Sequence, residues 1–305
     1  MIAGIALGLA AALCQSLSYV FSGRFVRTFH GPPHVLLAMA HVAMGLASVA
    51  LLPLVLPEAM PDLRSYIWPL LGGVVFYLVG QVGLFLALRY ADASRVSPLL
   101  GLKLPILAGI SLLFLGAHYT LTQWVAVGLC LLAALVLNHS GARLRGRSLG
   151  WILLTCMGYC LSDLNITALV LRLQGAGMSL SRASMVGGFL SYGLCGVLAV
   201  LLLPTIPWRD GRRWRYALPF AAAWLGAMLL LFGCFGAVGV VFGNIVQSTR
   251  GLISILIGWL VSTAGHVHLE ARANLAVWLR RVAAAVLMVL AIVLFSHGLG
   301  SGGLR

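Results

Sequence analysis

Long apolar segments follow one another along this chain, with only short polar connections between them. A helix that crosses the hydrocarbon core of a bilayer needs about 20 consecutive, mostly apolar residues. The segments of this kind are residues 2–23, 35–57, 66–90, 96–116, 120–138, 149–171, 182–204, 215–234, 239–264 and 278–297. The sequence therefore predicts an all-α polytopic membrane protein with ten transmembrane helices.

The composition is that of a chain whose surface faces lipid rather than water. Hydrophobic residues make up 61% of the sequence and charged residues 9%, whereas soluble proteins average about 45–50% and about 25%. The connections are too short to form a catalytic domain outside the membrane. All six cysteines fall inside apolar segments, and their spacing predicts neither a disulfide framework nor a metal site.

Positive charge dominates the polar connections, and the formal net charge is +14. In a soluble protein this excess would indicate a nucleic-acid partner. Here the arginines are spread over short loops, so the expected partners are anionic lipid headgroups and not nucleic acid. Fourteen arginines lie in or beside the connections that follow spans 1, 3, 5, 7 and 9, which all face one side of the membrane. Four arginines lie on the opposite side. Since cytoplasmic loops carry the excess of positive residues, this count predicts that both termini lie outside the cytoplasm.

Three charged residues stand in the middle of apolar segments: Lys103, Arg250 and Asp163. Lys103 is the only lysine in the chain, and the arginines other than Arg250 lie in loops or at segment ends. An ionised group at the centre of a bilayer costs about 2.5–3.5 kcal/mol on insertion scales. Charges placed there usually mark a functional pathway, and we interpret these three in that way.

The two halves of the chain share a pattern. Residues 86–115 and 231–260 each combine a span end, a turn of small residues and a new span with a basic residue one to two turns in. Lys103 and Arg250 occupy the matching places. The predicted repeats comprise residues 1–147 and 148–305, with five spans each. Because five is odd, the repeats must be inverted relative to each other, an arrangement typical of transporters that work by alternating access.

The segment ALRYADASRVSPLLGLKLPILAGISLLFLG, followed by TLTQWVAVGLCLLAALVL, resembles the junction of spans 3 and 4 in the drug/metabolite transporter superfamily, in its ten-span EamA type. NIVQSTRGLISIL in the second half is similar to a variant of that pattern. The resemblance implies a basket of eight helices, spans 1–4 and 6–9, around a central cavity. It also implies that spans 5 and 10 pack outside, as supports or homodimer contacts, and that no metal or organic cofactor is used.

The chain departs from the family's pattern in two respects. Many members carry a glutamate where this chain has Gly116, Ala117 and His118, and many carry basic residues before span 1, which this chain lacks. Family members usually have both termini in the cytoplasm, whereas the arginine distribution predicts the opposite. Both orientations stay open at this point.

Lys103 and Arg250 are the first candidates for substrate binding. Equivalent positions of an inverted repeat converge on its axis, and two cations that face one cavity repel unless an anion lies between them. Arginine can bind a carboxylate or phosphate through two parallel hydrogen bonds, and triose-phosphate-type members of the superfamily are similar in placing basic residues on these two spans. In the alternative, Lys103 pairs with Asp163 and Arg250 caps backbone carbonyls. Pro105 is expected to kink the helix near Lys103.

Asp163 shares one helical face with Tyr159, Ser162 and Thr167. Because a polar face turned to lipid would leave its groups unsatisfied, this face is predicted to line the cavity. Asp163 then neutralises a cation in the empty carrier, binds a substrate ammonium or carries a coupling proton. His41 is the second candidate for proton coupling, with a hydrogen-bonded core histidine as the alternative.

Further polar and aromatic residues complete the predicted substrate-binding set. They are Asn244 and Gln247 in span 9, Tyr77 and Gln81 in span 3, and Gln15 and Tyr19 in span 1. Trp224 stands in the second half at the place that matches Tyr77 and Gln81. Aromatic residues at these places either line a binding pocket or pack between helices.

Taken with the resemblance, these features predict a secondary transporter that exports a small anionic or zwitterionic metabolite, such as an amino acid or organic acid, across a bacterial inner membrane. The direction of export comes from the resemblance alone. The alternatives are a phosphorylated-metabolite exchanger, a lipid-handling flippase and a non-transporting membrane partner. The sequence contains neither a Walker motif nor HExxH, and the chain is not predicted to be an enzyme.

Overall fold

The computed structural model describes residues 1–29, 33–90, 100–137, 146–263 and 275–301, and the regular structure in these ranges is helical throughout. The first half of the chain forms α1 (Ile2–Phe29), α2 (Pro33–Leu51), η1 (Leu52–Leu54), α3 (Leu63–Tyr90), η2 (Leu100–Leu102), α5 (Lys103–Leu115) and α6 (Leu121–Leu137). The second half forms α7 (Gly146–Gly175), α8 (Leu180–Ala199), η3 (Val200–Thr205), α9 (Gly211–Val238), α10 (Val240–Ser248), α11 (Arg250–Thr263) and α12 (Leu275–Ser301). The all-α prediction is confirmed for these ranges.

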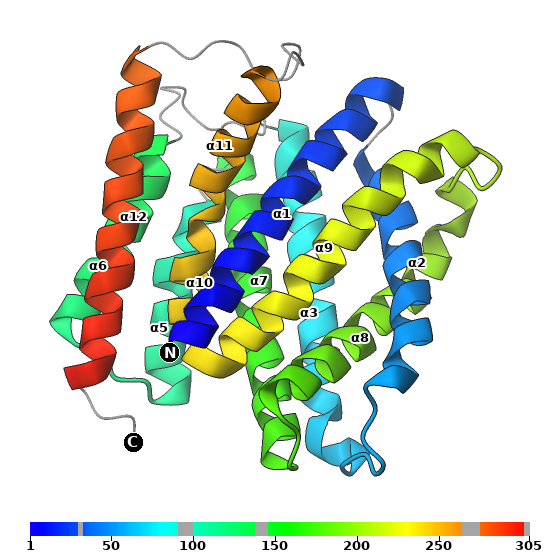
Figure 1. The fold of residues 1–305 in the computed structure, drawn as a ribbon, viewed down its shortest axis with the longest axis horizontal. Helices are drawn as coiled ribbons and strands as arrows, with labels where there is room; N and C mark the ends of the chain where they lie inside the picture. The colour runs from blue at the N-terminus through cyan, green and yellow to red at the C-terminus, as the bar shows by residue number, and fades with distance from the viewer. Residues whose placement is uncertain (30–32, 91–99, 138–145, 264–274, 302–305) are drawn as a thin grey trace.

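The helices run back and forth between two ends of the molecule, and the first turn of α1 and the last turn of α12 lie toward the same end (Figure 1). Six helices among the described residues are long and apolar enough to cross a membrane, namely Ile2–Val26, His34–Leu54, Leu63–Leu84, Leu149–Gly175, Leu180–Leu202 and Gly211–Val238. Shorter apolar helices follow at Leu100–Phe114, Leu121–Ala133 and Val282–Gly298. The chain is thus a polytopic membrane protein, while the number of ten spans stays a prediction.

The helices pair across the two halves of the chain. The most extensive contacts join α3 to α7, α1 to α9, α6 to α12 and α2 to α8. Smaller contacts join α1 to α11 and α5 to α7. The helices α1, α2, α3, α5 and α6 of the first half correspond to α7, α8, α9, α11 and α12 of the second. Exchanging corresponding helices turns the α3–α7 contact into α1–α9 and the α1–α11 contact into α5–α7, and it leaves α6–α12 and α2–α8 unchanged.

Glycines allow the paired helices to approach until their backbones touch. A Cβ atom added at Gly45 on α2 would lie 2.6 Å from the Cα atom of Gly196 on α8. A Cβ atom added at Gly158 on α7 would lie 2.7 Å from the backbone nitrogen of Gly80 on α3. A separation under 3.0 Å is not tolerated without movement of one partner, so these pairs require small residues, as helix contacts inside membranes commonly do.

The two basic residues of the apolar segments each begin a helix. Lys103 is the first residue of α5, directly after the short helix η2. Arg250 is the first residue of α11 and is separated from the end of α10 by Thr249 alone. Pro105 lies in the first turn of α5. A proline in the first turn fits a helix start, where its missing N–H group needs no partner, and the expected kink at Pro105 stays a prediction.

Candidate functional site

A cavity of about 280 Å³ lies between the two halves of the chain. Its described walls come from α1, α2, α3 and α5 of the first half and from α7, α8, α9, α10 and α11 of the second. Within the described ranges, α6 and α12 contribute no wall residue, and Figure 1 shows these two helices side by side at one edge of the molecule. The cavity is therefore a feature that both halves build together.

Lys103 and Asp163 form an ion pair at the wall of the cavity. Lys103 Nζ lies 2.5 Å from Asp163 Oδ2, and both side chains are largely buried. Asn244 on α10 donates a second hydrogen bond to Asp163 Oδ2, over 2.8 Å. The ammonium group of Lys103 also lies 5.8 Å from the ring centre of Tyr159. One carboxylate thus joins α5, α7 and α10, and its charge is balanced by a single lysine.

Arg250 lines the same cavity but is held by a neutral partner. Its Nη1 donates a hydrogen bond to Gln15 Oε1 over 3.1 Å, and Gln247 Nε2 donates to the same oxygen over 3.0 Å. The Arg250 carbonyl accepts a hydrogen bond from the Ser16 hydroxyl, which fixes the start of α11 against α1. A guanidinium group has five N–H donors, and within the described part of the chain Arg250 has no carboxylate partner.

Aromatic side chains form another wall. His41 Nδ1 lies 2.8 Å from the Leu37 carbonyl, which can only accept, so in the neutral ring His41 Nε2 accepts a hydrogen bond from the Tyr77 hydroxyl over 3.1 Å. Trp224 Nε1 donates to the Tyr192 hydroxyl, also over 3.1 Å. The rings of Tyr77 and Tyr192 meet edge to face with their centres 6.3 Å apart. This wall is therefore held by hydrogen bonds between its own members.

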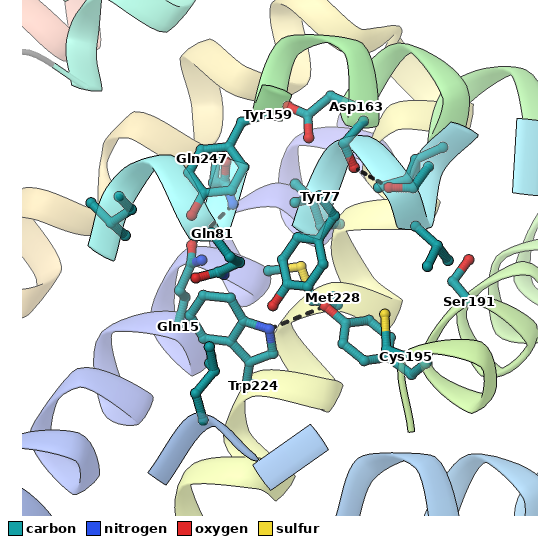
Figure 2. Close-up of a pocket in the computed structure, with 18 of the residues that line it drawn as sticks. Gln15, Tyr77, Gln81, Tyr159, Asp163, Ser191, Cys195, Trp224, Met228 and Gln247 are labelled. Carbon is teal, nitrogen blue, oxygen red and sulfur yellow. Dashed lines mark hydrogen bonds between the residues drawn. The ribbon is translucent and has the colours of Figure 1, made fainter. Parts of the chain in front are cut away.

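The polar groups are distributed unevenly around the cavity. Figure 2 shows the carboxamides of Gln15, Gln81 and Gln247 gathered on one side, and Ser191 and Cys195 on the opposite side. Apolar lining residues include Phe220, Met228 and Leu231 from α9. The cavity can thus hold a small molecule that has one charged end and one apolar end.

Comparison with protein families gives a match for the first half of the chain. Residues 2–139 match the model of the EamA-like transporter family, which is part of the drug/metabolite transporter superfamily. Residues 2–139 are therefore EamA-like. This finding confirms the resemblance, and it indicates a membrane transporter of the drug/metabolite transporter type. Comparison with curated proteins gives no match.

Solved structures share the fold seen here. One, titled only "Crystal structure of protein", superposes with a TM-score of 0.69. The two sequences are 17% identical, and the match covers 96% of this chain and 98% of the other. At this identity the likeness concerns the fold alone.

The predicted binding residues of this EamA-like protein lie around one space. With the exception of Asn244, every residue of the predicted set lines the cavity: Lys103, Arg250, Asp163, Tyr159, Gln247, Tyr77, Gln81, Gln15 and Tyr19. Asn244 lies behind Asp163, and His41 lies behind Tyr77. The structure also contains the ion pair between Lys103 and Asp163 that was left open as an alternative. The Arg250 side chain donates to the carboxamide oxygen of Gln15, whereas the alternative had it cap backbone carbonyls.

Several cavity residues escaped the sequence analysis. Ser191, Tyr192 and Cys195 line the cavity from α8, and Met228 lines it from α9. Ser191 and Cys195 are four residues apart, which places them on one helical face. That spacing is a usable signal, but cysteine and methionine are ordinary packing residues in apolar helices. Within the described ranges, no group of three or more His, Cys, Asp or Glu side chains is placed to hold a metal ion.

Proposed function

We propose that this EamA-like protein is a secondary transporter that carries a small anionic or zwitterionic metabolite, such as an organic acid or amino acid, out across a bacterial inner membrane. The observation that carries the proposal is the position of Lys103 and Arg250. They stand at matching places in the two halves of the chain and line one cavity. Among the described residues, Asp163 is the only carboxylate that lines the cavity with them, so an anionic group of the substrate completes the charge balance.

Alternating access around this cavity is the mechanism we propose. The main helix pairs, α3 with α7, α1 with α9, α6 with α12 and α2 with α8, map onto one another or onto themselves when the two halves are exchanged, which supports two inverted repeats, residues 1–147 and 148–305. In such a pair, rocking one repeat against the other opens a central site to each side of the membrane in turn. The direction of transport and the bacterial inner membrane rest on the family resemblance.

Asp163 is the residue that we propose for proton coupling, with His41 as the second. A proton on the Asp163 carboxyl group would remove the charge that holds Lys103 at 2.5 Å and would weaken the contact between α5 and α7. The rate of transport by an Asp163→Asn variant should then no longer vary with pH. A pH profile identical to that of the wild type would leave Asp163 as a counter-ion only.

The helices α6 and α12 are proposed to support the basket of cavity-lining helices from outside and to provide the contacts of a homodimer. Leu132 on α6 and Val286 on α12 are among the exposed apolar residues of this pair. Native mass spectrometry of the protein in a mild detergent should show a dimer that a charge at Leu132 or Val286 dissociates. A monomer at all concentrations would remove this part of the proposal.

Transport itself can be tested by counterflow. The purified protein is reconstituted in liposomes loaded with one unlabelled metabolite, and the uptake of trace labelled metabolite is measured for a panel of organic acids, amino acids and sugar phosphates. We expect the wild type to concentrate an anionic or zwitterionic compound and Arg250→Gln to lose that uptake. Arg182→Gln is the matched control, because Arg182 is exposed at the start of α8. Equal uptake by the wild type and Arg250→Gln would contradict the proposal.

A further inference from the structure

The two halves of the chain place corresponding residues at corresponding helix contacts. Gln15 precedes Asp163 by 148 residues, and Lys103 precedes Arg250 by 147. Asp163 on α7 meets Lys103 on α5, and Gln15 on α1 meets Arg250 on α11. The contact between α1 and α11 is the counterpart of the contact between α7 and α5. The same interaction thus occurs twice, once with a carboxylate and once with a neutral carboxamide.

This difference leaves one positive charge uncompensated. Among the described residues that line the cavity, Lys103 and Arg250 are positive and Asp163 is negative, so the formal charge of the wall is +1. The carbonyl oxygen of Gln15 lies where the symmetry-related contact has a carboxylate, and it already accepts hydrogen bonds from Arg250 and Gln247. A charge in a site of low dielectric is costly unless it is paired, so the empty cavity favours a ligand of opposite charge.

A zwitterion does not satisfy this balance. Its carboxylate could bind Arg250, but its ammonium group would need a second carboxylate. Asp163 is already engaged, at 2.5 Å by Lys103 and at 2.8 Å by Asn244. An ammonium group that entered there would meet the positive charge of Lys103, and like charges at such distances repel strongly when water is excluded.

A phosphate monoester fails for the opposite reason. It carries a charge of about −1.5 to −2 at neutral pH. Its second negative charge would require Lys103 to leave Asp163, which would then be a buried and unpaired carboxylate. Removing one partner from a buried ion pair costs about 3–5 kcal/mol.

We propose that the cavity selects a monoanion, a molecule with one carboxylate and an uncharged apolar or ring-bearing body that lacks an ammonium group. This inference rests on the transport function proposed above and narrows its substrate class. The carboxylate binds the guanidinium of Arg250, and the body lies against Phe220, Trp224 and Met228. Binding pockets for drug-sized ligands measure about 300–1,000 Å³, so a cavity of about 280 Å³ suits a small body such as a single ring or a branched chain.

The experiment compares ligands that share a body and differ in charge. The purified full-length protein in detergent is titrated calorimetrically with 3-phenylpropionate, phenylalanine and 2-phenylethyl phosphate, and with the branched pair 4-methylvalerate and leucine. We expect each monocarboxylate to bind at least tenfold more tightly than the zwitterion or phosphate of the same body. Tighter binding of phenylalanine or leucine would overturn the inference while leaving the proposed transport function intact. If none of the five ligands binds, the inference falls, and counterflow with the wider panel decides whether the transport function falls with it.

Variants that change the formal charge of the cavity wall by one unit test the same inference by altering the protein instead of the ligand. Arg250→Gln lowers the formal charge to zero, and the tenfold preference for the monocarboxylate should disappear. Asp163→Asn raises it to +2, and binding of 2-phenylethyl phosphate should overtake that of 3-phenylpropionate. Size-exclusion chromatography and circular dichroism establish that each variant is folded, and where Asp163→Asn does not fold, Arg250→Gln alone decides. An unchanged preference in a folded Arg250→Gln variant would overturn the proposal.

Discussion

Asp163 holds Lys103 across the contact between α7 and α5, with 2.5 Å between the carboxylate oxygen and the ammonium nitrogen. The pair lies in the wall of a cavity that both halves of the chain build. Its counterpart at the other helix contact is the hydrogen bond from Arg250 to Gln15, in which the carboxylate is replaced by a carboxamide. Among the described residues, one cation of the cavity is paired with a carboxylate and the other with a carboxamide, which is why we propose that the second binds an anionic ligand.

Breaking the ion pair should destabilise the protein. In Asp163→Asn, the charge of Lys103 loses its partner in a largely buried position, and we expect the free energy of unfolding to fall by about 3 kcal/mol. Chemical unfolding in detergent, followed by circular dichroism, measures this change. Asp210→Asn is the matched control, since the pair between Asp210 and Arg213 is considerably more exposed and should cost less than about 1 kcal/mol.

A second variant distinguishes pairing from general damage to the fold. Lys103→Met combined with Asp163→Asn removes both charges, so it should recover much of the stability that Asp163→Asn loses. Such non-additivity is expected for residues in direct contact. A double variant whose loss equals the sum of the two single losses would show that the ion pair contributes nothing specific.

Gln15→Glu should weaken anion binding, because it places a carboxylate beside Arg250. The new carboxylate would lie where the Gln15 carboxamide now accepts hydrogen bonds from Arg250 and Gln247, and it would pair with Arg250 as Asp163 pairs with Lys103. We expect the affinity for a monocarboxylate to fall at least tenfold, without loss of thermal stability. Gln174→Glu is the control, because Gln174 does not line the cavity. Undiminished binding in Gln15→Glu would show that the anion does not occupy Arg250.

Tyr77→Phe should destabilise the aromatic wall. The Tyr77 hydroxyl is the hydrogen-bond partner of His41 Nε2, and its removal leaves a buried ring nitrogen unsatisfied at a cost of about 1–3 kcal/mol. Thermal unfolding of the purified protein measures the loss. Tyr216→Phe is the control, since Tyr216 is only half-buried and substitutions away from buried partners usually change stability by about 0.5 kcal/mol or less.

Gly45→Ala should disturb the contact between α2 and α8. The added Cβ atom would lie 2.6 Å from the Cα atom of Gly196, and because backbone cannot move aside cheaply, overpacking should cost about 1–3 kcal/mol. A Cβ atom at Gly128 on α6 meets nothing within 4 Å. Gly128→Ala should therefore keep or slightly raise the melting temperature, because alanine is the better helix former. Equal melting temperatures for the two variants would contradict the close helix contact.

The charged residues in the apolar segments were better predictors of the cavity lining than the aromatic residues were. Lys103, Asp163 and Arg250 stand out because ionised groups are rare in apolar helices, and burial forces such groups together. Tyr192 and Met228 carry no such signal, since aromatic and sulfur-containing side chains also fill ordinary helix contacts. The relation between Gln15 and Asp163 depends on which helices touch, and that information is not contained in the spacing of apolar residues.

The most direct test is a structure with a marked ligand. The protein would be crystallised with 3-(4-bromophenyl)propionate, and the bromine would be located by its anomalous scattering. We predict that the carboxylate lies within hydrogen-bond distance of the Arg250 guanidinium, with the bromine against Trp224 and Met228, and with Lys103 still paired to Asp163. A ligand outside the cavity, or one whose carboxylate does not contact Arg250, would contradict the claim that an anion completes the charge of this site.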